Sequence, residues 1–132
     1  MRLSFQYFLC FFLLSLTLLT ACGRIQPAPA DTTGVQIELA VDPASPAVGP
    51  ARLLVTLTGP DGQPIDGATV EVEGNMTHAG MTPVFAQTTA SEQGRYTVPF
   101  EWTMAGDWIV TVRVTLPGGE QVRREFPVRV GG

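Results

Sequence analysis

Alternation of apolar and polar residues dominates the chain from residue 35 to its end. Apolar positions recur every second residue, and Gly, Pro, Asp and Asn interrupt the runs. No segment keeps a helical period for ten residues. Such alternation is typical of β-strands with one face in a core and the other in solvent. The pattern predicts an all-β domain with strands over residues 35–41, 52–58, 68–73, 84–89, 96–102, 108–116 and 122–130.

The number and spacing of these strands indicate one architecture. About seven short strands separated by turn residues, in a single domain of this length, are typical of an immunoglobulin-like β-sandwich. A Gly59-Pro60-Asp61-Gly62 turn follows the second strand, because Pro presets the backbone and Gly accepts a positive φ. Only five residues separate Trp102 from Trp108, so we expect the fifth and sixth strands to form a hairpin with Met104 near its tip.

The last strand contains a conflict in its pattern. Arg124 falls in the same phase as Val122 and Phe126, which should point inward. Either a bulge near Arg124 or an edge position would resolve this conflict. Pro127 also favours an edge, because proline cannot donate a ladder hydrogen bond.

The first 22 residues have the features of a bacterial export signal. Arg2 supplies a positive charge, and an apolar run of signal-peptide length follows. The run ends in Leu19-Thr20-Ala21-Cys22, which resembles the lipobox whose Cys is acylated and begins the mature chain. We therefore expect a signal peptide over residues 1–21 and lipidation of Cys22. An uncleaved membrane anchor with an incidental Cys is the alternative.

Acylation of Cys22 would determine where the protein resides. Two or more acyl chains would hold it at a membrane surface, so we expect an extracytoplasmic, membrane-anchored lipoprotein on the cell surface or in the periplasm. Residues 22–34 are small, polar and Pro-containing, and they predict a flexible tether. The folded domain then covers residues 35–132.

Composition argues against several classes of function. Without Arg2, seven basic residues stand against twelve acidic ones, a net charge of −5 that argues against a nucleic-acid partner. Apart from Cys22 the mature chain has no thiol, so disulfides and thiolate ligands are unavailable. It has no lysine, a single histidine and no G-x-S-x-G motif, so Schiff-base and hydrolase-triad chemistry are not expected. We expect a protein that is not an enzyme.

The stretch with the most distinctive chemistry is Asn75-Met76-Thr77-His78-Ala79-Gly80-Met81. It holds the only histidine and two of the three methionines of the mature chain, and the third is Met104. Thioether sulfur is soft and imidazole is a borderline base. The cluster therefore matches copper, as Cu(I), better than zinc, calcium or magnesium. We predict a metal site formed by Met76, His78, Met81 and Met104.

Local geometry supports this ligand set, and a simpler interpretation competes with it. An extended backbone from Asn75 to His78 would place Met76 and His78 on one face, and Gly80 would allow a turn that brings Met81 round. Alternatively, Met81 and Met104 are pliable core residues and His78 is an exposed loop residue. Trp102 and Trp108 are more typical of a core than of a site, although either could shield a Cu(I) centre.

Several motifs, taken in order, resemble one family. They are the stretch 61–72, the segment Met76-Thr77-His78-Ala79-Gly80-Met81, the tripeptide Gly94-Arg95-Tyr96, and Met104-Ala105-Gly106-Asp107-Trp108. Together they are similar to the YtkA-like, or FixH-like, family, and the resemblance spans residues 35–130. The resemblance implies a small exported or membrane-anchored β-sandwich, of a family in which some members are linked to copper handling and to assembly of haem-copper oxidases.

The resemblance and the residues together lead to a functional expectation. We expect a membrane-anchored lipoprotein that binds copper, as Cu(I), through its Met/His cluster and acts in copper handling or oxidase assembly. Its partners would be membrane lipid, through acylated Cys22, and a membrane protein such as an oxidase or a copper transporter. We expect the domain to be a monomer. The alternative is a metal-free β-sandwich interaction module that assists a membrane complex.

Overall fold

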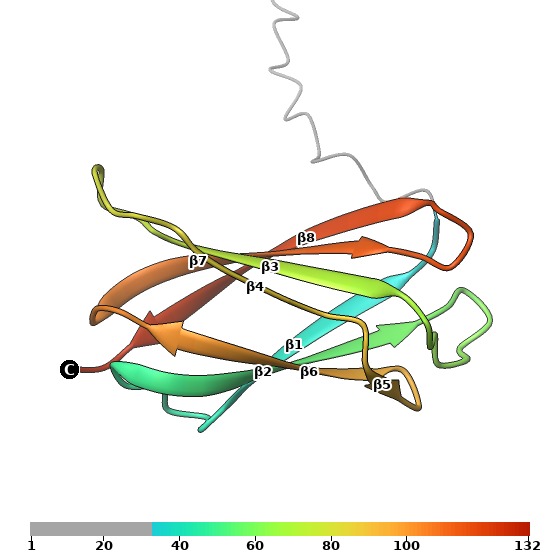
Figure 1. Cartoon of the computed structure of the whole chain (residues 1–132), viewed down its shortest axis with the longest axis horizontal. Helices are drawn as coiled ribbons and strands as arrows, with labels where there is room; N and C mark the ends of the chain where they lie inside the picture. The colour runs from blue at the N-terminus through green and yellow to red at the C-terminus, as the bar shows by residue number, and fades with distance from the viewer. Residues whose placement is uncertain (1–32) are drawn as a thin grey trace, which may run out of the picture. The chain divides into compact units, whose positions relative to one another are not determined.

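Two four-stranded antiparallel sheets form the domain (Figure 1). The computed structural model describes residues 33–132, so the predictions for the signal peptide, Cys22 and most of the tether lie outside the described residues. One sheet has the strand order β1-β2-β6-β5 and the other has the order β4-β3-β7-β8. The strands are β1 (Gln36–Asp42), β2 (Gly49–Thr58), β3 (Thr69–Met76), β4 (Val84–Thr88), β5 (Ser91–Glu92), β6 (Arg95–Trp102), β7 (Gly106–Thr115) and β8 (Gln121–Val130).

The predicted all-β, immunoglobulin-like sandwich is confirmed, and each predicted strand has a counterpart. The sequence analysis missed only β5, whose two residues are too few to show an alternating pattern. Within the described residues no helix is long and apolar enough to cross a membrane.

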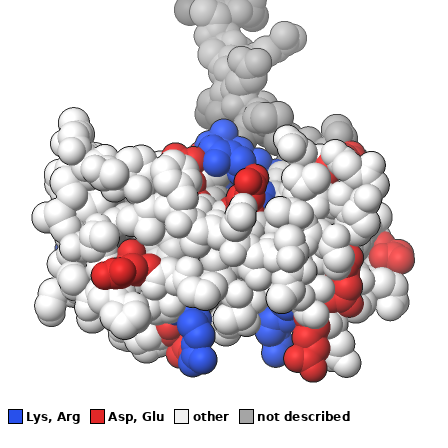
Figure 2. Space-filling model, viewed as in Figure 1, with Lys and Arg blue, Asp and Glu red and all other residues white. Residues whose placement is uncertain are grey.

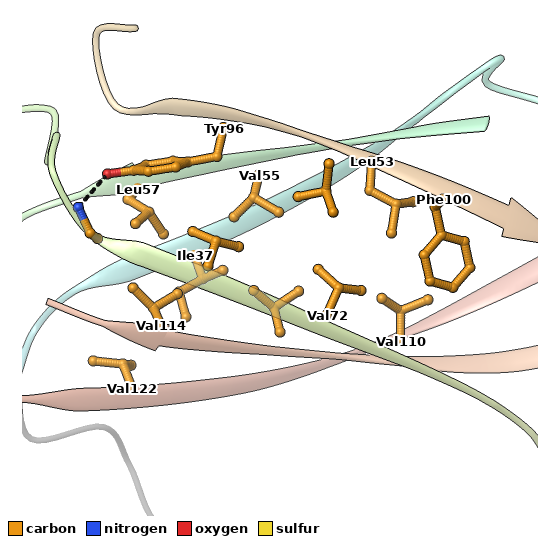
Figure 3. Close-up of a cluster of buried hydrophobic side chains, with 14 of the residues drawn as sticks. Ile37, Leu53, Val55, Leu57, Val72, Tyr96, Phe100, Val110, Val114 and Val122 are labelled. Atoms are coloured by element: carbon orange, nitrogen blue, oxygen red, sulfur yellow. Dashed lines mark hydrogen bonds between the residues drawn. The ribbon is translucent and has the colours of Figure 1, made fainter. Parts of the chain in front are cut away.

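Alternation along the strands builds the core between the sheets. In β6 every second residue is buried, and Tyr96, Val98, Phe100 and Trp102 all point inward. Valines and leucines of β2, β3 and β7 meet them from both sheets (Figure 3). Each such side chain contributes roughly 1.5–3 kcal/mol when it is removed from water. Because the core and both sheets are complete within residues 33–132, we expect a domain of residues 31–132, which contains them, to fold by itself.

A buried glycine completes the packing beside the aromatic residues. Gly74 of β3 occupies a position whose side chain would point inward. A Cβ there would lie 2.5 Å from Cζ of Phe100 and 3.4 Å from Cε3 of Trp108. The absence of a side chain at Gly74 therefore makes room for these two rings.

The predicted hairpin between β6 and β7 is wrong. These strands belong to different sheets, so residues 103–105 form a corner that crosses the sandwich. The inward side chains of both strands therefore face each other: the rings of Trp102 and Trp108 make an edge-to-face contact with centroids 5.3 Å apart. Alternation specifies which face of a strand is buried, and the same spacing suits a hairpin or a corner.

Strand β8 lies at the edge of its sheet, which confirms the edge alternative for Arg124 and Pro127. No bulge is present, because pairing runs without interruption from Gly106–Val130 to Thr115–Gln121. The guanidinium of Arg124 is accommodated at the open side of the sandwich. It donates to the carbonyl oxygen of Ile37 at 3.0 Å and lies 5.4 Å from the ring centroid of Phe126.

A buried tyrosine fixes the connection between β2 and β3 to the core. The Tyr96 hydroxyl accepts a hydrogen bond from the Ala68 N–H at 3.0 Å and donates one to the Ile65 carbonyl oxygen at 2.8 Å (Figure 3 draws the first). The ring of Tyr96 is buried, so both bonds are shielded from water. The predicted turn at residues 59–62 is also confirmed: the Gly62 N–H donates to the Gly59 carbonyl oxygen at 2.9 Å.

Candidate functional site

The connection between β3 and β4 carries three of the four predicted ligands. Strand β3 ends at Met76, the chain bends at residues 77–78, and a turn follows in which Gly80 has a φ of 84°. The predicted turn at Gly80 is confirmed. An extended backbone through His78 is wrong, because the chain leaves the sheet after Met76.

The bend has a physical cause in the neighbouring strand. Met76 pairs with Trp108 of β7, and β7 begins only two residues earlier, at Gly106. The Thr77 N–H makes one last backbone bond, to the Asp107 carbonyl oxygen at 3.1 Å. Beyond that point β7 supplies only its first residue, Gly106, so the backbone leaves the sheet.

The fourth predicted ligand lies on the corner between β6 and β7. Met104 is 47% exposed, and its carbonyl oxygen accepts a hydrogen bond from the buried indole N–H of Trp108 at 3.0 Å. The core therefore holds the backbone of this corner in place. The β3–β4 connection and this corner lie at the same end of the sandwich as the C-terminus (Figure 1).

An open groove of about 680 Å³ runs between these two connections. Met81 lines the groove from the β3–β4 connection, and Met104 lines it from the corner between β6 and β7. Phe85 and small or apolar residues complete the lining. The lining contains no Asp, Glu, Lys or Arg; its members are Gly80, Met81, Thr82, Pro83, Val84, Phe85, Thr103 and Met104. The groove thus offers two thioethers in uncharged surroundings.

The other two predicted ligands are not in the groove lining. His78 is exposed on the bend. Met76 is half-buried and packs against the core, with its terminal methyl 2.9 Å from where a Cβ of Gly106 would stand. Gly106 also has a φ of 134°, so this close approach depends on glycine. The structure therefore brings Met81 and Met104 together and places Met76 beneath the start of β7.

Charged groups surround this end of the domain without entering the groove. Asp107 forms an ion pair with Arg129 at 2.7 Å, and both side chains are exposed. On the outer face of β3, hydrogen bonds from Asn75 and then Arg113 lower the pKa of Glu73. In the view of Figure 2, charges of both signs are scattered and form no massed patch of one sign. Within residues 33–132 no group of three His, Cys, Asp or Glu side chains lies close enough together to hold a metal ion, so any metal site there would depend on methionine.

Phe85 is a residue of this site that sequence reasoning missed. It is 68% exposed, and it lines the groove from the beginning of strand β4. The sequence contained a signal for it. Phe85 alternates with Val84 and Ala86, whose side chains are partly buried against the core, so the side chain of Phe85 points to the solvent. Together with Met81 and Met104, Phe85 forms a contiguous apolar lining, and such a patch, rather than a single exposed side chain, indicates a contact surface.

The fold and the groove define a class: small all-β sandwich domains with an exposed methionine-lined end. The YtkA-like family matches residues 30–113, and the chain belongs to this family. That assignment confirms the YtkA-like resemblance. No curated protein matches the chain significantly.

Solved structures share the architecture at low sequence identity. A superoxide reductase (neelaredoxin) from Ignicoccus hospitalis aligns at 11% identity with a TM-score of 0.51, over 74% of this chain and 80% of that one. The soluble domain of PmoD from a Methylocystis species aligns at 18% identity with a TM-score of 0.48, over 72% and 90% of the two chains. Murine CRIg aligns at 12% identity with a TM-score of 0.41, over 73% and 95%. The first of these likenesses supports the fold alone.

Proposed function

We propose that the protein is a membrane-anchored, extracytoplasmic lipoprotein that binds copper, as Cu(I), and acts in copper handling or oxidase assembly. The observation that supports this proposal is the uncharged groove lined by both Met81 and Met104. We infer a binding role rather than a catalytic one. The membrane partner would be an oxidase or a copper transporter, and nucleic acid would not be a partner.

The donor set of the groove suits Cu(I). Thioether sulfur is soft and needs no deprotonation to bind a metal, and the lining has no carboxylate that would favour magnesium or calcium. Met104 is 47% exposed and Met81 is half-buried, so both can be reached from solvent. His78 lies three residues before Met81, with the turn at Gly80 between them, and it would be a third donor. Met76 would need to leave its contact with Gly106 to take part.

Removal of sulfur from the groove is expected to weaken Cu(I) binding. Met81→Leu and Met104→Leu keep the apolar volume, and each should lower the affinity by about tenfold or more, which corresponds to about 1.4 kcal/mol. The measurement is a titration of the 31–132 domain against a chromogenic Cu(I) competitor. Phe85→Leu is the matched control, because Phe85 lines the same groove without a donor atom.

The remaining candidate ligands belong in the same titration series. His78→Ala should lower the affinity, and acidification should lower the wild-type affinity more than that of His78→Ala, because imidazole ligates only when neutral. Met76→Leu should have a smaller effect than Met81→Leu. If wild type does not compete for Cu(I), or if Met81→Leu and Met104→Leu match Phe85→Leu, the copper proposal is wrong.

A metal-free interaction module is the second candidate function. The exposed Phe85 supports it, because Phe85 continues the apolar lining formed by Met81 and Met104, and contiguous apolar surfaces mark contact sites. In that case a partner of the membrane complex would contact the groove directly. Retention of partner binding by Met81→Leu and its loss in Phe85→Ala would favour this function over copper binding.

Cys22 is expected to be the site of processing and acylation in the full chain. Cys22→Ser should leave an unprocessed precursor that carries no acyl label, whereas Cys10→Ser should be processed normally. Metabolic labelling with a fatty-acid analogue and the mobility of the protein on a gel provide the measurement. Normal cleavage and membrane retention of Cys22→Ser would contradict the lipoprotein proposal.

A further inference from the structure

Methionine is the side chain within residues 33–132 that a peroxide oxidises most readily. Both cysteines of the chain, Cys10 and Cys22, lie outside this range. The indole rings of Trp102 and Trp108 are buried, with exposed fractions of 0% and 1%. A two-electron oxidant that reaches the domain therefore meets thioether sulfur first.

The three methionines of the domain differ in how well an oxidant can reach them. Met104 is 47% exposed on the corner between β6 and β7. Met81 is half-buried in the lining of the groove. Met76 packs against the core, with its terminal methyl 2.9 Å from where a Cβ of Gly106 would stand. Because the oxidant arrives through solvent, these differences predict that Met104 reacts first, Met81 second and Met76 last.

The fold does not depend on the sulfur of Met104. Its side chain is not among those of the hydrophobic core, and its backbone carbonyl oxygen accepts the hydrogen bond from Trp108. Oxidation makes a methionine side chain polar, and this disrupts packing where the sulfur is buried. Oxidation of Met104 should therefore change the chemistry of the groove and leave the domain folded.

We propose that Met104 is a site of reversible oxidation that switches off soft-metal binding in the groove. This inference rests on the proposed function, because metal affinity is what the switch controls. In the forward step an S–O bond forms and the O–O bond of hydrogen peroxide breaks. The sulfur loses two electrons, and the second oxygen of the peroxide leaves as water. The sulfoxide is no longer a thioether donor, so the groove lining keeps only the sulfur of Met81.

The position of Met104 also permits the reverse step. Its neighbours Thr103 and Ala105 are exposed as well, so an enzyme can reach the sulfoxide on this corner. A methionine sulfoxide reductase with a dithiol restores the thioether. The oxygen leaves as water, and the dithiol supplies two electrons and two protons and becomes a disulfide.

Peptide mass analysis of the 31–132 domain during exposure to hydrogen peroxide tests the order of oxidation. Met104 should gain one oxygen at least several-fold faster than Met76, with Met81 between them. At the time when Met104 alone is oxidised, the circular dichroism spectrum and the unfolding transition should match those of the untreated domain. Equal rates at Met104 and Met76, or unfolding on oxidation of Met104, would overturn the proposal.

The Cu(I) affinity of the oxidised domain, measured after the peroxide has been removed, tests the switch itself. The affinity should fall by about tenfold or more as Met104 is oxidised, as in Met104→Leu, and treatment with the reductase should restore it. Met104→Leu should lose no further affinity over the same interval. Met76→Leu is the matched control, and its affinity should fall at the same rate as that of wild type.

The switch and the copper proposal fail in distinguishable ways. If untreated wild type binds Cu(I) and the domain oxidised at Met104 binds it equally well, the switch is wrong and the copper proposal stands. If untreated wild type does not bind Cu(I), the copper proposal is wrong, and the switch fails with it because the groove has no metal affinity to control. Failure of the reductase to restore the affinity would show that the oxidation is damage and not a switch.

Discussion

Replacing Trp108 with alanine is expected to lower the free energy of unfolding by about 3–5 kcal/mol. The side chain is 1% exposed, contacts the ring of Trp102, and holds the carbonyl of Met104. The loss approaches the whole stability of a small domain, which is about 5–15 kcal/mol. Urea denaturation of the 31–132 domain followed by circular dichroism measures it. A loss below about 1 kcal/mol would show that Trp108 is not part of the core.

Phenylalanine variants of the two tryptophans separate volume from hydrogen bonding. The indole N–H of Trp108 donates to Met104, whereas the buried indole nitrogen of Trp102 has no acceptor among the described residues. Trp108→Phe leaves the Met104 carbonyl without its donor, while Trp102→Phe removes an unsatisfied group. We therefore expect Trp108→Phe to cost about 1 kcal/mol more than Trp102→Phe. Equal losses, or a greater loss for Trp102→Phe, would contradict this assignment.

The variants Trp108→Phe and Trp102→Phe also test whether Trp108 positions Met104 in the candidate copper site. Because the bond from Trp108 holds the backbone of Met104, Trp108→Phe should weaken Cu(I) binding more than Trp102→Phe does, even at temperatures where both variants are folded. A change in affinity that follows stability alone, and is the same for both variants, would mean that Trp108 does not position Met104.

Gly94→Ala is expected to destabilise the domain by about 2–5 kcal/mol, the sum of a left-handed backbone strain and overpacking. Gly94 has a φ of 73°, and a Cβ there would lie 2.7 Å from the Leu57 carbonyl oxygen and 2.8 Å from Cβ of Pro64. The Leu57 N–H also donates to the Gly94 carbonyl oxygen at 2.8 Å, so the backbone cannot move freely. Urea denaturation again provides the measurement.

Gly119→Ala is the matched control for this variant. Gly119 has a φ of 89°, but nothing lies within 4 Å of the position of its Cβ. It should therefore cost only the backbone strain of about 1–2 kcal/mol. If the two variants lose the same stability, the contacts of Gly94 with Leu57 and Pro64 contribute nothing.

Gly94 also influences the response of the domain to acid. Its N–H donates to Asp66 at 2.9 Å, and this bond, followed by one from the Ser91 hydroxyl, lowers the pKa of Asp66 below its ordinary value. A carboxyl whose pKa is lowered by folding stabilises the domain above its unfolded pKa, and this contribution disappears as the pH falls through the folded value. Asp66→Asn should therefore reduce the loss of stability below about pH 4.

The amino-acid sequence by itself determined the strands, their buried faces and the candidate chemistry. Alternation identified the strands from β1 to β8 except β5, and it implied that every second residue along them is buried, as observed in β6. These features are local: whether a side chain points inward depends on its phase within one strand. The same local information left β8 with either a bulge near Arg124 or an edge position, with Pro127 in favour of the edge, and it predicted the turn at Gly80.

Only the tertiary structure decided which strands are neighbours and which ligands meet. Pairing joins residues far apart in the chain, so the short link between Trp102 and Trp108 could not reveal that it crosses from one sheet to the other. The bend after Met76 follows from where β7 begins, and it leaves His78 outside the groove that Met81 and Met104 share. Phe85 likewise lines this groove with Met104 because β4 lies beside β6, and which strands lie side by side is a property of the assembled sandwich.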